Sequence, residues 1–220
     1  MKMSLNQKIL SRNDQCAQKN HDFFAEHGIL CLNVISSPGS GKTTLLAHTI
    51  RLLKDVLTIG VVEGDIRTDY DAQRIRETGA EAVQIETEGA CHLSAEQVAG
   101  ALMAMDSKHK DIIFIENVGN LVCPSAFHLG EAGRVVVLSI PEGDDKPAKY
   151  PGTFAQADIV LINKIDLMGP ISFNLERALA DIHTVNPDAA ILQVSASTGQ
   201  GMESWCDWLI EKRKAVAHKS

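Results

Sequence analysis

Apolar runs bounded by turn residues alternate along the chain with segments of helical apolar spacing. The runs, which are typical of buried strands, are residues 30–35, 56–62, 82–85, 111–115, 134–140, 157–162 and 190–194. Helical spacing is found at 45–53, 71–78, 94–105 and 173–183, and again after residue 201. Strands that alternate with helices predict an α/β fold in which a mostly parallel sheet is covered on both faces, giving three layers.

The polar segments between these elements complete the predicted organisation. Residues 4–27 carry apolar side chains at helical spacing, so we expect a helix there that ends before Gly28 and packs outside the sheet. Residues 142–151 are predicted to form a polar loop containing Pro147 and Pro151. Because no linker or repeat interrupts the pattern, one domain over residues 1–220 is expected.

Composition and charge narrow the classes of function. The net charge of −7 disfavours a nucleic-acid partner. No apolar stretch is long enough to cross a bilayer and residues 1–16 lack the apolar region of a signal peptide, so no membrane partner and a cytoplasmic location are expected. Five scattered cysteines are too few for a disulfide framework, which makes them free thiols or metal ligands.

Residues 36–44, Ser-Ser-Pro-Gly-Ser-Gly-Lys-Thr-Thr, join the first strand to a helix and predict a phosphate-binding loop. Glycines let the backbone approach phosphate oxygens, Lys42 can neutralise the β- and γ-phosphates, and the Thr43 hydroxyl can ligate Mg²⁺. Ser36 stands where the general pattern has Gly, and Ser disfavours positive φ. The candidate nucleotide-binding residues of the loop are Gly39, Ser40, Gly41, Lys42, Thr43 and Thr44.

Residues 163–166, Asn-Lys-Ile-Asp, follow a predicted strand and indicate guanine as the base. The Asp166 carboxylate can accept hydrogen bonds from N1–H and the 2-amino group of guanine, whereas adenine would leave it unpaired. Lys164 can lay its stem over the base, and Asn163 can tie the loop together. The backbone at Ser195 and Ala196 is expected to contact guanine O6. GTP or GDP is therefore the predicted nucleotide.

Glu116 and Gly119 stand where GTPases usually carry Asp-x-x-Gly. The Glu116 carboxylate is expected to hold Mg²⁺, with Asp65 as a competing or additional ligand. The Gly119 N–H is expected to sense the γ-phosphate. Lys42, Thr43, Asp65, Glu116 and Gly119 are the candidate catalytic residues. Asn120 occupies the position of the water-orienting Gln of many GTPases, so intrinsic hydrolysis should be slow.

With these residues the chain closely resembles the hydrogenase nickel-insertion GTPases (maturation factor B), of the SIMIBI class of P-loop GTPases. The motifs that carry the resemblance are residues 36–46, 116–124 (Glu-Asn-Val-Gly-Asn-Leu-Val-Cys-Pro) and 145–151 (Asp-Lys-Pro-Ala-Lys-Tyr-Pro). The resemblance implies a GTP-dependent homodimer that passes nickel toward the [NiFe]-hydrogenase large subunit, with a nickel-binding accessory protein as partner. Some relatives carry a Cys- or His-rich N-terminal segment; this one has only Cys16, His21 and His27 there, so strong nickel storage is not expected at that end.

Cys91, His92 and Cys123 match the metal site of the same family. Thiolate and imidazole ligands suit Ni²⁺ or Zn²⁺ rather than Mg²⁺. Three ligands leave a tetrahedral ion one position short, which water, a partner chain or ligands shared across a two-fold axis could fill. The alternative is that the two cysteines are buried thiols and His92 is an exposed polar residue.

Two other functions compete with nickel delivery to hydrogenase. A urease accessory GTPase would share the fold, but that family has a Cys-Pro-His metal motif, whereas this chain has Cys91-His92 and Cys123-Pro124. A P-loop small-molecule kinase or ATPase would share the phosphate loop, but residues 163–166 disfavour it.

Overall fold

A single sheet of seven strands forms the centre of the molecule, in the order β3-β2-β4-β1-β5-β6-β7. The computed structural model describes residues 5–65, 70–87 and 89–217, without the side chains of residues 5–9 and 65. Every strand pair is parallel, which confirms the predicted sheet. The strands are β1 (Leu30–Ser36), β2 (Ile59–Asp65), β3 (Glu81–Glu86), β4 (Ile112–Glu116), β5 (Gly133–Ser139), β6 (Ile159–Asn163) and β7 (Ala190–Gln193).

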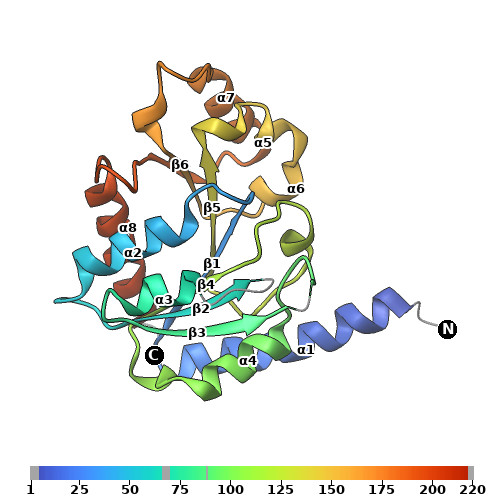
Figure 1. Cartoon of the computed structure of the whole chain (residues 1–220). Helices are drawn as coiled ribbons and strands as arrows, with labels where there is room; N and C mark the ends of the chain where they lie inside the picture. The colour runs from blue at the N-terminus through green and yellow to red at the C-terminus, as the bar shows by residue number, and fades with distance from the viewer. Residues whose placement is uncertain (1–4, 66–69, 88, 218–220) are drawn as a thin grey trace.

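Helices cover both faces of the sheet, as predicted (Figure 1). One face carries α2 (Lys42–Leu53), α3 (Tyr70–Arg76) and α8 (Met202–Ala217), which pack on a core that includes Phe114 and Trp205. On the other face α1 (Leu5–Glu26) packs against α4 (Ala95–Ala104), and Ser94 and Gln97 form the capping box that begins α4. In the described residues a further helix of several turns is α7 (Leu175–Val185).

The strand order explains where a ligand can bind. β1 lies between β4 and β5, so the chain leaves β1 toward one side of the sheet and later crosses to the other. In open parallel sheets, ligands bind outside the carboxyl ends of the strands at such a switch point. The register brings together the ends that carry the predicted motifs: Glu63 lies opposite Glu116, and Ser139 lies opposite Asn163.

The predicted polar loop at 142–151 is wrong in part. A 3₁₀ turn (Ile140–Glu142) is followed by the one-turn helices α5 (Lys146–Lys149) and α6 (Pro151–Phe154). Pro147 and Pro151 occupy the first turns of α5 and α6, where a helix leaves its N–H groups unpaired and proline therefore costs no hydrogen bond. α5 packs on α7, which accounts for structure in so short a segment.

None of the helices in the described part of the chain combines the length and the apolar character needed to span a bilayer.

Candidate nucleotide and metal site

The loop between β1 and α2 has the geometry of a phosphate cradle. Gly39 and Gly41 have φ values of 75° and 94°, which glycine adopts without steric cost. Gly41 is the N-cap of α2 and has a left-handed backbone conformation. Because glycine has no side chain, it does not cap the helix. The free N–H groups of the helix start and the positive end of its dipole therefore remain available to an anion.

Ser36 departs from the general phosphate-loop pattern without strain, because it is the last residue of strand β1. Its hydroxyl accepts hydrogen bonds from the Ser40 hydroxyl at 2.5 Å and from the Lys42 ammonium at 3.0 Å. Lys42 is buried and its cation is held at the base of the loop, where incoming phosphates can take over its hydrogen bonds.

Thr43 and Glu116 meet at the predicted Mg²⁺ position. The Thr43 hydroxyl donates to Glu116 Oε1 at 2.9 Å, and both residues are buried. Glu63, opposite Glu116 on β2, is a third buried group at this place. As carboxylates, Glu63 Oε1 and Glu116 Oε2 have no hydrogen-bond partner in the described residues. Two carboxyl oxygens beside a hydroxyl are a ligand set that fits Mg²⁺. The ion would supply positive charge to the β- and γ-phosphates.

The electrostatics of these two acids agree with a binding site for a cation. Burial raises the pKa of Glu63 well above its usual range, and the adjacent Glu116 raises it further. Burial also raises the pKa of Glu116, although the Lys42 ammonium and the Thr43 hydroxyl oppose this effect. Glu63 was missed by sequence reasoning, which chose Asp65; the available signal was a charged residue directly after the apolar run of β2. The side chain of Asp65 lies outside the described residues.

Gly119 lies against the phosphate loop. A Cβ built on Gly119 would lie 2.9 Å from Pro38 Cα and 3.0 Å from Pro38 N, both backbone atoms. Only glycine allows this approach. The backbone at Gly119 therefore lies directly beside the loop in which we expect the phosphates to bind.

The predicted base loops are joined to the phosphate loop by Asn163. Its Nδ2 donates to the Ser40 carbonyl at 2.9 Å, and its Oδ1 accepts from the Ala196 N–H at 3.1 Å. Lys164, at φ 62°, donates to the Gly39 carbonyl at 2.6 Å. The structure therefore places these side chains together beyond the carboxyl ends of the strands.

Asp166 lies beside Ser195, whose hydroxyl donates to Asp166 Oδ1 at 2.5 Å. Thr44 differs from the other loop residues, because its hydroxyl accepts from Arg74 of α3 at 2.9 Å. Thr44 was expected to bind nucleotide, and its side chain here serves to join α2 and α3.

Cys91, His92 and Cys123 form a cluster whose three ligand atoms all lie within 4.8 Å of one another. The Sγ of Cys91 is 3.6 Å from Nδ1 of His92, whose ring stacks on Phe127 with centroids 3.8 Å apart. Cys123 begins a 3₁₀ turn (Cys123–Ala126). A hydrogen bond with Cys123 raises the pKa of the Cys91 thiol, and burial lowers that of His92, so the free ligands favour the uncharged forms.

Comparisons with known proteins agree with this geometry. Residues 30–193 match the family model described as "CobW/HypB/UreG, nucleotide-binding domain". The hydrogenase maturation factor HypB of Rhizobium leguminosarum bv. viciae is 52% identical over 213 residues, covering 96% of this chain and 71% of the relative.

Two solved structures resemble the whole fold. HypB from Helicobacter pylori, solved in complex with nickel, has a TM-score of 0.89 at 40% identity over 93% of this chain and 96% of its own. HypB from Archaeoglobus fulgidus has a TM-score of 0.87 at 38% identity, covering 93% of this chain and all of its own. The chain therefore belongs to the HypB hydrogenase maturation factors of the CobW/HypB/UreG nucleotide-binding family.

Proposed function

We propose that this chain is a GTP-hydrolysing metallochaperone that delivers nickel during maturation of [NiFe]-hydrogenase. The observation that carries the proposal is the short segment from Glu116 to Cys123. It begins against the Thr43 hydroxyl, contacts the phosphate loop through Gly119, and ends in the cysteine–histidine cluster. A change at the γ-phosphate and a change at the metal ligands therefore act on one stretch of backbone.

Guanine specificity is proposed from Asp166. Its Oδ1 is fixed by Ser195, which leaves the carboxylate oriented and still able to accept from the N1–H and 2-amino donors of guanine. Asn163 holds this loop to Ser40, so the base and the phosphates would bind to loops that are hydrogen-bonded to each other.

In the proposed reaction, water attacks the γ-phosphorus, the bond to the β-phosphate oxygen breaks, and GDP and inorganic phosphate are formed. Lys42 neutralises charge on the transferring group, and the loop N–H groups hold the β-phosphate. Thr43 and Glu116, with Glu63 beside them, would hold Mg²⁺. Positioning and charge neutralisation supply most of the catalysis in this class of reaction.

Nickel is the proposed cargo of the cluster, and Zn²⁺ is the competing ion for the same ligands. Cys91, His92 and Cys123 provide three ligands, which leaves room for a water or for a ligand from a second copy of the chain. A homodimer with the site at its interface, a nickel-binding accessory protein and the hydrogenase large subunit are the proposed partners. The family membership and the relative solved with nickel support this assignment.

Nucleotide competition separates this function from a kinase or ATPase. Purified protein loaded with a fluorescent GDP should release it on addition of GTP and not of ATP, and Lys42→Ala should bind or hydrolyse GTP poorly. Equal displacement by ATP would refute the guanine assignment.

A deletion strain tests whether the chain acts in the maturation of hydrogenase or of urease. Loss of hydrogenase activity that added nickel restores, with urease unaffected, is the expected result. Unaltered hydrogenase activity in the deletion strain would contradict the proposed function.

A further inference from the structure

Four buried polar side chains form a continuous chain between the end of β4 and the loops of the cysteine–histidine cluster. They are Asn117, Asn33, Glu131 and Arg134, and we call them the Asn117–Arg134 network. Sequence reasoning assigned no role to any of them. Because buried polar groups are costly unless they are paired, the partners of each side chain indicate what the network does.

Asn117 holds the first of the two ligand loops. Its Oδ1 accepts a hydrogen bond at 3.2 Å from the N–H of Leu93, the residue directly after His92. The same oxygen accepts from the Val118 N–H at 3.0 Å. Asn117 also follows Glu116 in sequence. Its side chain therefore connects the carboxyl end of β4, where Mg²⁺ is expected, with the backbone that carries Cys91 and His92.

Arg134 holds the second ligand loop. Its guanidinium donates to the carbonyls of Ser125 at 3.0 Å and Phe127 at 3.1 Å, and Nη2 lies 3.1 Å from Nδ1 of His128. Ser125 belongs to the 3₁₀ turn that Cys123 begins, and the Phe127 ring stacks on His92. One buried cation therefore fixes the backbone on both sides of the aromatic ring that supports a ligand.

Asn33 and Glu131 join the two halves. Asn117 Nδ2 donates to Asn33 Oδ1 at 3.1 Å, and Asn33 Nδ2 donates to Glu131 Oε1 at 3.3 Å. The same Glu131 oxygen accepts from Arg134 Nε at 2.8 Å. The sheet sets this contact, because Asn33 of β1 lies opposite Arg134 of β5.

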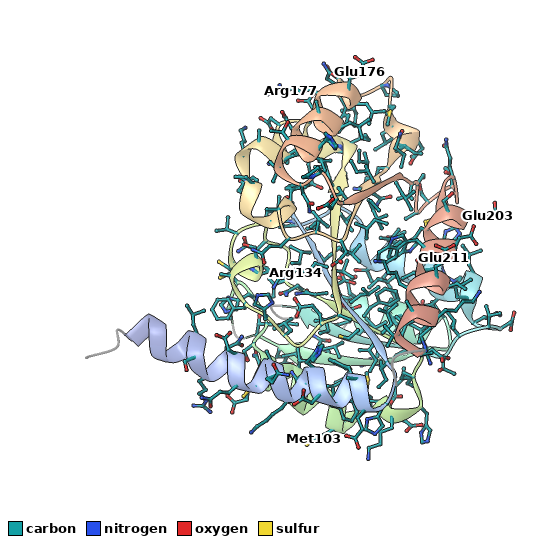
Figure 2. The ribbon with its side chains drawn as sticks, turned by 180° about the vertical axis from the view of Figure 1, so that it is seen from behind. Met103, Arg134, Glu176, Arg177, Glu203 and Glu211 are labelled. Carbon is teal, nitrogen blue, oxygen red and sulfur yellow. The ribbon has the colours of Figure 1, made fainter. Side chains whose placement is uncertain are left out.

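The burial of Arg134 distinguishes it from an ordinary surface arginine. Its side chain is 5% exposed, whereas that of Arg177 on α7, which pairs with Asp144 and Asp181, is 54% exposed. Figure 2 shows Arg134 within the body of the molecule and Arg177 at its periphery. Arginine presents its donors in a planar fork, which lysine cannot reproduce at several acceptors at once.

We propose that Arg134 and Asn117 are positioning residues for the cargo metal. Through the network they hold the two ligand loops in the geometry that binds the metal. They also connect these loops to Glu116, at the proposed nucleotide site. This inference rests on the proposed function, because it assumes that the cluster takes Ni²⁺ and that β4 ends at a nucleotide. Residues that orient metal ligands without touching the ion typically affect metal affinity by about 10–100-fold when they are changed.

Arg134→Lys is the test, with Arg177→Lys as the matched control at an exposed ion pair. Ni²⁺ is titrated into the full chain loaded with GDP, and then with a nonhydrolysable GTP analogue, and the thiolate-to-nickel absorption band is recorded. Arg134→Lys should bind Ni²⁺ at least about 10-fold more weakly, within the range above, with an altered absorption band. The ratio of Ni²⁺ affinities in the two nucleotide states should move toward one. GDP affinity should remain within about twofold of wild type, and Arg177→Lys should behave as wild type.

A second variant guards against loss of folding. Arg134→Met combined with Glu131→Leu removes the ion pair as a unit, so neither charge is left buried without its partner, and a urea unfolding curve verifies that the variant is folded. It should show the same weakened and nucleotide-independent binding.

The proposal is overturned if the folded variants bind Ni²⁺ as wild type does, or lose affinity equally in both nucleotide states. Wild-type protein that binds no Ni²⁺ would instead overturn the proposed function itself.

Discussion

Gly119 lies directly against Pro38 of the phosphate loop, with only 2.9 Å between an ideal Cβ on Gly119 and Pro38 Cα. Real Cβ atoms do not approach a backbone carbon so closely, so any larger residue at 119 must displace the loop. Gly119→Ala is therefore predicted to weaken binding of a GTP analogue about tenfold relative to GDP, near the lower end of the ~1–3 kcal/mol cost of overpacking.

Gly100→Ala is the matched control for this substitution. Gly100 lies in α4, and beyond its own helical backbone no atom of the described residues lies within 4 Å of a built Cβ, so alanine there should be neutral or slightly stabilising. Equilibrium binding of fluorescent nucleotides measures both variants. Equal losses for GDP and the GTP analogue in Gly119→Ala would mean that Gly119 does not respond to the γ-phosphate.

Asp166→Asn is predicted to shift the base preference from guanine toward xanthine. The substitution replaces an acceptor with a donor opposite the guanine 2-amino group, whereas xanthine offers a carbonyl there. An unpaired buried polar group costs about 1–3 kcal/mol, which corresponds to roughly a 5–150-fold loss of GTP affinity. Competition between GTP and XTP measures the change, and Asp188→Asn at the exposed turn before β7 should leave the preference unaltered. A retained guanine preference would remove Asp166 from the base pocket.

Intrinsic hydrolysis is predicted to be well below the ~1–10³ s⁻¹ typical of enzymes. Asn120 takes the place of a water-orienting Gln, and its Oδ1 already accepts from the Val122 N–H at 2.7 Å within its own loop. A side chain held in this way is not free to orient the attacking water. Single-turnover phosphate release by the isolated protein measures the rate, and several turnovers per second without a partner would refute the prediction.

Acid should destabilise the fold in part through Asp111, which directly precedes β4. Burial acts to raise the pKa of this carboxyl, but hydrogen bonds from Thr58 N and Oγ1, both at 2.8 Å, and from Arg213 at 3.0 Å lower it overall. Since the folded pKa lies below the unfolded value of ~3.9, this stabilisation is complete above the unfolded pKa and is lost as pH falls through the folded one.

Urea unfolding at several pH values tests the Asp111 prediction. Asp111→Asn mimics the protonated carboxyl, so its urea midpoint should lie below that of wild type at pH 7 and approach it near pH 3. A gap that stays constant across this range would show that ionisation of Asp111 is not responsible.

The sequence predicted those features that depend on neighbours along the chain. Apolar runs such as 30–35 located the strands, and the glycines around Ser40 located the loop, because each is determined within about ten residues. The strand order was not predictable, since it depends on which distant segments pair. The one-turn helices α5 and α6 were missed because four residues are too few for helical periodicity, although Pro147 and Pro151 were available as signals.

The site was predictable only as far as its motifs extend. Cys91 and Cys123 were paired by resemblance, and the structure brings them together with His92. Glu63 was missed because its importance comes from register: it becomes a candidate only once β2 lies beside β4 and Glu116 stands opposite. Arg134 and Asn117 were missed for the same reason, because their partners are contributed by other strands and loops.

Cys91→Ala and Cys123→Ala are predicted to lose Ni²⁺ binding while keeping GTP binding. The segment 116–123 joins Glu116, Gly119 and Cys123, so movement of Gly119 toward a γ-phosphate must alter the position of Cys123 relative to Cys91. Wild type should therefore bind Ni²⁺ with different affinities in the GDP and GTP-analogue states. Linkage requires Ni²⁺ to change nucleotide affinity by the same factor, typically ~5–150-fold for couplings of about 1–3 kcal/mol.

Cys206→Ala supplies the control for this last prediction. Burial in α8 raises the pKa of the Cys206 thiol to about 11, and Cys206 is not part of the cluster, so its removal should leave both Ni²⁺ affinities unchanged. The titrations use one fixed protein concentration, because a site at a dimer interface would make affinity depend on protomer concentration. If wild type binds Ni²⁺ equally in both nucleotide states, the segment does not transmit the γ-phosphate signal and nickel release must be driven from outside it. If the affinities differ in wild type and in Cys206→Ala, and both cluster variants lose Ni²⁺ binding in either nucleotide state, then Cys91 and Cys123 belong to the site whose Ni²⁺ affinity the nucleotide changes.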